Sequence, residues 1–112
     1  MSDHPTLDLS PLVIPTHEAE ATIAERFDAF HEVNPWVADA MEALIADWLS
    51  HGHKRASTKW AIEIIRWQYG RETTGDQGFR LNSDFTSRYA RLLIERHPSW
   101  ADAIHTRALR AA

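Results

Sequence analysis

The stretch between Asn34 and Gly52 repeats its apolar residues with the period of an α-helix, and this pattern most constrains the fold. Residues at i, i+4, i+7, i+8 and i+11 share one face of a helix. Asn34 is a suitable N-cap, Pro35 fits the first helical position, and Gly52 suits the end of the helix. The sequence therefore predicts an amphipathic helix that begins after Asn34 and ends near Gly52. Its apolar face comprises Val37, Met41, Leu44, Ile45 and Trp48.

Three further segments carry helical signals. Thr16 is a suitable N-cap for a helix over about 17–31, whose glutamates near its start suit the positive end of the helix dipole. The apolar spacing predicts another helix over 84–97, and Ser99 resembles the opening of a final helix near the C-terminus.

The segment TKWAIEIIRWQYG, residues 58–70, predicts one more helix, which Ser57 can cap. Its apolar residues lie nearly all round the helix, so we expect it to be largely buried between its neighbours. Trp48, Trp60 and Trp67 are accordingly expected in the core.

Together these segments predict an all-α fold of about five helices in one compact domain, which a chain of 112 residues can fill. Residues 17–112 form this domain, and residues 1–16, with three prolines, form an extended or disordered arm. The core is similar to a helix-turn-helix. The loop over 70–82, with its three glycines, is however far longer than the usual connection, and a short hairpin fits there.

The net charge of −4 conceals a division along the chain. Residues 1–50 carry ten acidic side chains and only Arg26 as a base, whereas residues 51–112 carry eleven Lys or Arg against six acids. Such asymmetry indicates contact between the basic half and a polyanion. The plain alternative is that the acidic helices dock against the basic ones.

The composition argues against several functional classes. The chain has no cysteine, and His51 and His53 of the HGH turn have no third ligand nearby, so neither a metal nor a cofactor is expected. Because no nucleophile elbow, phosphate loop or dinucleotide fingerprint occurs, we expect no catalytic residues and no enzymatic activity. Without a signal peptide or membrane span in the sequence, we expect a cytoplasmic protein with no membrane partner.

The basic residues of the second half come from three places that a helical fold can bring together: the 53–55 turn, the 71–82 loop and the 84–97 helix. Arginine and lysine attract phosphates, and Asn or Ser at a helix N-terminus can donate to phosphate oxygens or reach base edges. We therefore predict a small nucleic-acid-binding protein, with DNA as the first expectation. The predicted contacts are Lys54, Arg55, Arg80, Asn82, Ser83, Ser87, Arg88 and Arg91.

Two other classes of function stay open. One is a non-enzymatic adaptor or inhibitor that binds a host protein through the acidic N-terminal helices, with Trp36 as a contact. The other is a structural protein that associates with itself through an apolar helix face, as a homodimer. For Arg88 and Arg91, the plain alternative is an exposed helix face that pairs with the acidic helices.

Six short motifs are spread along the chain from residue 27 onward: NPWV, GHKRAS, EIIRW, FRLN, SRYARLL and TRALR. In this combination the chain resembles a family of small uncharacterised helical proteins found in phages, prophages and bacterial genomes. The resemblance implies a phage or mobile-element setting, and it implies that FRLN and SRYAR belong to one module.

Overall fold

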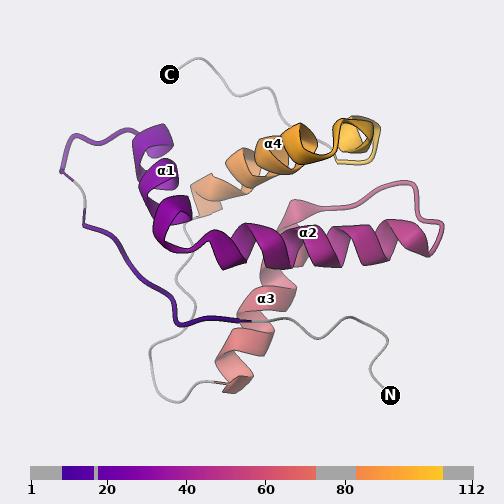
Figure 1. Cartoon of the computed structure of the whole chain (residues 1–112), viewed down its shortest axis with the longest axis horizontal. Coiled ribbons are helices and arrows are strands. Elements are labelled where there is room, and N and C mark those ends of the chain that lie inside the picture. The colour runs from indigo at the N-terminus through magenta and orange to yellow at the C-terminus, as the bar shows by residue number, and fades with distance from the viewer. Residues whose placement is uncertain (1–8, 17, 73–82, 105–112) are drawn as a thin grey trace.

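The computed structural model describes residues 9–16, 18–72 and 83–104, and their regular structure is helical (Figure 1). No β-strand occurs in these ranges, so the predicted all-α class is confirmed there. The loop over 73–82, including the proposed hairpin, lies outside the described residues. The elements are α1 (Ile23–Val33), α2 (Pro35–Ser50), α3 (Thr58–Glu72), η1 (Ser83–Phe85), α4 (Thr86–Arg96) and η2 (Pro98–Asp102), where η marks a 3-10 helix.

The first helix begins later than the sequence pattern predicts. Thr22, and not Thr16, is the N-cap of α1. The Thr22 hydroxyl accepts a hydrogen bond from the backbone N–H of Glu25, and the Glu25 carboxylate accepts one from the backbone N–H of Thr22, each at 3.1 Å. This reciprocal capping box satisfies two donors that a helix start leaves unpaired, which explains why the helix starts here. The predicted start at residue 17 is therefore wrong.

The predicted helix after Asn34 is confirmed as α2. Its apolar face is buried as the period requires, apart from Trp48, which lies at the exposed end of the helix. Gly52, with φ of 91°, adopts the left-handed conformation that turns the chain after α2. In Figure 1, α2 crosses the middle of the molecule, α4 lies above it and α3 extends below it.

Aromatic rings fill the space between α1 and the start of α4. Phe27 of α1 meets Tyr89 edge to face at 4.8 Å between ring centres, and it meets Phe85 in the same way at 5.5 Å. Such edge-to-face pairs stabilise a core beyond the area that they bury. The cluster joins the buried face of α2, so that α1, α2, α3 and α4 share one hydrophobic core.

The segment over 9–16 has no helix or strand, yet it packs on the domain. Leu9 and Leu12 lie against the core, and the backbone N–H of Leu12 donates to the Tyr69 hydroxyl at 3.0 Å. Asn34, between α1 and α2, holds the backbone of Val13. This part of the predicted arm is therefore extended and fixed to the domain.

After α4, Pro98 starts the short 3-10 helix η2 in place of the fifth α-helix that the sequence predicts. Residues 105–112, the rest of that predicted helix, lie outside the described residues. Ile104 belongs to the core, and Trp100 packs against it. The chain then meets the turn between α2 and α3, where the backbone N–H of Ala56 donates to the carbonyl of Ala103 at 3.0 Å.

Helix α3 differs most from its prediction. It buries Ala61, Ile62, Ile65 and Tyr69, but Trp60 and Trp67 lie on the opposite face, 58% and 59% exposed. The prediction that these two tryptophans and Trp48 belong to the core is wrong. The domain is flat, with Cα extents of 43 × 39 × 17 Å.

Candidate functional site

The N-terminal ends of α3 and α4 lie side by side. The Thr58 hydroxyl, at the first residue of α3, donates to the backbone carbonyl of Thr86, the first residue of α4, at 3.5 Å. Lys54 and Arg55 precede this contact along the chain, and Arg88 follows it. We name these three basic residues together with Arg91 the basic corner.

Of the eight residues predicted to contact nucleic acid, the structure describes the side chains of five. Lys54, Arg55 and Arg91 are exposed, whereas Ser87 and Arg88 are half-buried at the start of α4. Ser83 is described only as the first residue of η1. The remaining two predictions, Arg80 and Asn82, lie outside the described residues.

Electrostatically, the corner favours anions. The N-terminal ends of α3 and α4, which carry the positive ends of the helix dipoles, meet at the Thr58–Thr86 contact. Asp84 of η1 is an exposed acid at the same end of α4 and opposes this potential. Such an arrangement can attract phosphate oxygens.

The acidic helix α2 pairs with the opposite end of α4. Arg96 lies 3.1 Å from the Asp39 carboxylate and 2.7 Å from that of Glu42, and the His97 ring lies 2.9 Å from the second Glu42 oxygen. These hydrogen bonds, from His97 and from Arg96, hold the pKa of Glu42 below its usual value. Within the described residues, no ion pair joins Arg88 or Arg91 to an acid.

Trp36, the predicted anchor for a protein partner, is half-buried. Its ring stacks on Tyr69 with 6.1 Å between ring centres and packs against the core. Trp36 therefore covers a joint between α2 and α3, and only part of its ring faces solvent.

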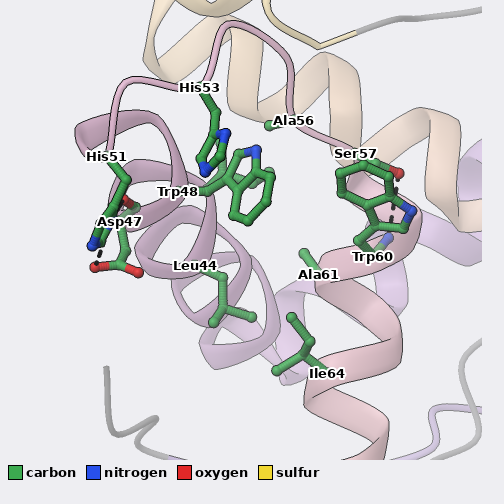
Figure 2. A pocket seen from close by; sticks show the side chains of 11 residues that line it. Leu44, Asp47, Trp48, His51, His53, Ala56, Ser57, Trp60, Ala61 and Ile64 are labelled. Atoms are coloured by element: carbon green, nitrogen blue, oxygen red, sulfur yellow. Dashed lines mark hydrogen bonds and ion pairs between the residues drawn. The ribbon is translucent and has the colours of Figure 1, made fainter. Parts of the chain in front are cut away.

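A second surface feature is an apolar groove of about 490 Å³ between the end of α2 and the start of α3. Figure 2 shows Leu44 of α2 and Ala61 and Ile64 of α3 along the groove, with Trp48 and Trp60 bordering it. Polar side chains at its edge are Asp47, His51, His53 and Ser57. A hollow of this size and apolar lining is typical of a binding site.

Trp48 forms the wall between this α2–α3 groove and the basic turn. Its indole N–H donates to the carbonyl of Arg55 at 2.7 Å, and the His53 ring stacks on it with 3.7 Å between ring centres (Figure 2). His53 is thus engaged in packing, and His51 contacts Asp47 of the preceding turn. No group of three or more possible metal ligands occurs in the part of the chain that the structure describes.

The groove and the exposed face of α3 were missed by sequence reasoning. The apolar residues of α3 surround the helix, so its period did not indicate which face would be covered. The spacing of Trp60, Ile64 and Trp67 at i, i+4 and i+7 marks a second apolar stripe and was the available signal.

In comparison with known proteins, no family model, no curated protein and no solved structure matches the chain. The resemblance to phage-type proteins therefore stays a prediction, as does the cytoplasmic location. None of the described helices has the length and apolar character that a membrane crossing requires.

Proposed function

We propose that this chain is a small, non-enzymatic nucleic-acid-binding protein that uses the basic corner to contact phosphates. The observation that supports the proposal is the hydrogen bond between Thr58 and Thr86, since Lys54 and Arg55 precede Thr58 by four and three residues and Arg88 follows Thr86 by two. Lys54 and Arg55 contact phosphates from the turn, and Arg88 and Arg91 from α4.

The arginines of α4 differ in their partners, and this difference supports the proposal over the alternative that Arg88 and Arg91 pair with the acidic helices. Asp39 and Glu42 are engaged by Arg96, which lies at the far end of the helix. Arg91 points outward, and α4 packs on the core through Tyr89, Ala90 and Leu93. The basic corner is therefore distinct from the ion pairs that attach α4 to α2.

The finer proposal is a helix-turn-helix-like arrangement in which the first turns of α4 face DNA, with Ser87 and, from the preceding segment, Asn82 and Ser83 reaching polar atoms. DNA is named first because the wide major groove admits a helix, whereas the major groove of double-stranded RNA does not.

Fluorescence anisotropy with labelled duplex DNA, single-stranded DNA and RNA over a series of salt concentrations tests the proposal. Affinity should fall steeply with salt, because binding releases counterions from phosphates. Lys54→Gln and Arg55→Gln should each reduce the slope of log affinity against log salt by about 1. Arg26→Gln removes the same charge from the acidic half and should leave the slope unchanged. Absent binding at low salt, or binding that ignores salt, would exclude this function.

The competing proposal, an adaptor that binds a host protein through the acidic helices, receives less support. Glu25 caps α1, and Asp39 and Glu42 are paired with α4, so these acids already serve the fold. Trp36 is largely covered by Tyr69 and the core.

A further inference from the structure

The outer face of α3 carries an uncovered apolar stripe. Trp60, Ile64 and Trp67 follow one another at i, i+4 and i+7 and are 58%, 40% and 59% exposed. Arg71, the next residue of the stripe, lies over the Trp67 ring at 4.8 Å from its centre, yet more than half of Trp67 stays exposed. A helix with a second apolar face opposite its buried one is built to pack on a further layer.

This stripe is continuous with the α2–α3 groove, because Trp60 and Ile64 belong to both. The surface thus combines a ridge, which ends at Trp67, with a hollow beside Trp60. We propose that a second copy of this chain covers it, with the two α3 helices packed antiparallel about a two-fold axis close to Ile64.

The spacing of ridge and hollow suits such an axis. Trp60 and Trp67 are seven residues apart, which is about 10 Å along a helix. When the axis passes midway between them, Trp67 of each copy comes level with Trp60 of the partner subunit, where the groove opens. The two-fold axis repeats this contact, so each copy supplies one tryptophan and one groove.

The charged flank of α3 in one copy is complementary to the same flank in the second copy when the two are related by this axis. Lys59, Glu63 and Arg66 lie exposed on the flank away from the groove, so this flank carries both signs of charge, and Glu63 pairs with Arg66 at 3.2 Å. In an antiparallel helix pair, equal flanks face each other, so Glu63 of one copy approaches Arg66 of the partner subunit, and the reverse. A flank of a single sign would repel its own copy.

The exposed apolar side chains supply part of the area that a dimer interface needs. Trp48, Trp60, Ile64 and Trp67 together leave on the order of 300–400 Å² of apolar surface exposed. A standard interface buries roughly 800 Å² on each partner, so these four residues would supply close to half of it. Their aromatic character fits the centre of an interface, and the flanking charges fit its rim.

Sedimentation equilibrium of the full chain without nucleic acid, over a wide range of micromolar concentrations, tests the dimer independently of the proposed function. Ile64→Asp places two like charges at the axis and should weaken the dimer at least about tenfold. Ile23→Asp is the matched control, because Ile23 is 41% exposed and lies at the start of α1, away from the stripe. It should leave the dissociation constant of the dimer unchanged. Far-UV circular dichroism tests whether both variants stay folded.

A charge exchange tests the orientation without altering the apolar stripe. Glu63→Arg and Arg66→Glu should each weaken the dimer, and the double variant should restore it, because the pairing across the axis is then reversed but complete. A wild type that is monomeric at every concentration would mean that a different partner covers the stripe and would overturn the proposal. So would a dimer that survives Ile64→Asp, or a double variant no better than the single ones.

Discussion

Asn34 holds the backbone of Val13 through both ends of its side-chain amide. Its Oδ1 accepts a hydrogen bond from the Val13 N–H at 2.8 Å, and its Nδ2 donates to the Val13 carbonyl at 2.6 Å. The same nitrogen donates to the carbonyl of Phe30 at 3.1 Å, and the whole side chain is buried. One amide thereby replaces a strand partner for the extended segment that precedes α1.

Asn34→Ala should therefore lower the free energy of unfolding by about 2–3 kcal/mol, because it removes the side-chain amide that pairs with both the N–H and the carbonyl of Val13. Urea denaturation followed by circular dichroism measures the change. Val13→Ala removes an exposed side chain but keeps the backbone contacts, and should cost less than about 0.5 kcal/mol. Equal losses for the two variants would contradict this role of the amide.

Two buried tyrosines should respond in opposite directions to loss of the hydroxyl. Among the residues that the structure describes, the Tyr89 hydroxyl finds no hydrogen-bond partner, so Tyr89→Phe should be neutral or stabilising by up to about 1 kcal/mol. The Tyr69 hydroxyl accepts from Leu12, and Tyr69→Phe should cost about 0.5–1.5 kcal/mol. Thermal denaturation of the two variants side by side provides the comparison, and a loss for Tyr89→Phe as large as that for Tyr69→Phe would refute it.

The ion pairs between α2 and α4 should make the protein sensitive to acid. Because the pKa of Glu42 is lowered in the folded protein, its contribution is complete above its ordinary pKa of 4.5 and is lost as the pH falls through the lower, folded value. Glu42→Gln should flatten the acid limb of a plot of unfolding free energy against pH. At neutral pH the cost should be less than about 1 kcal/mol, since the pair is partly exposed. An unchanged acid limb would show that the pair does not contribute.

His31 should add a second dependence on pH, nearer neutrality. Burial, and then the positive charge of Arg96, lower its pKa from the ordinary 6.5, while Asp39 and Asp28 offset part of the effect. The neutral ring is thus favoured in the fold, and stability should fall as the pH drops from above 6.5 towards the folded pKa. His31→Gln should reduce the slope of unfolding free energy in that window, as measured by urea denaturation at several pH values. If the slope is the same in both proteins, the dependence arises elsewhere.

The elements that could be predicted from the sequence are those in which the apolar residues follow a single helix face. In α2 a single apolar face and a Pro35 start left no choice, and the helix formed where expected. In α1 the start was predicted at Thr16, whereas the cap is Thr22, which stands three residues before Glu25 in the spacing of a capping box, a signal that was overlooked. In α3 both faces are apolar, and only the position of the neighbouring helices decides that Ile65 is buried and Trp67 exposed.

The candidate site likewise has features that could be predicted from the sequence and features that could not. The kinds of residue in the basic corner, Lys54, Arg55, Arg88 and Arg91, follow from composition and charge. The hydrogen bond that joins the first residues of α3 and α4 connects Thr58 and Thr86, which are 28 residues apart, and local pattern carries no information on such a contact. The choice of Arg96 as the partner of the acids on α2 is likewise a matter of tertiary placement.

The 17 Å depth of the domain has a consequence for α3. Packed helices lie about 8–10 Å apart, so this depth accommodates two layers of helices and no middle layer. In such an arrangement α3 has neighbours on one side and water on the other. The described residues thus place in an outer layer a helix whose sequence, apolar on nearly every side, is that of a central one.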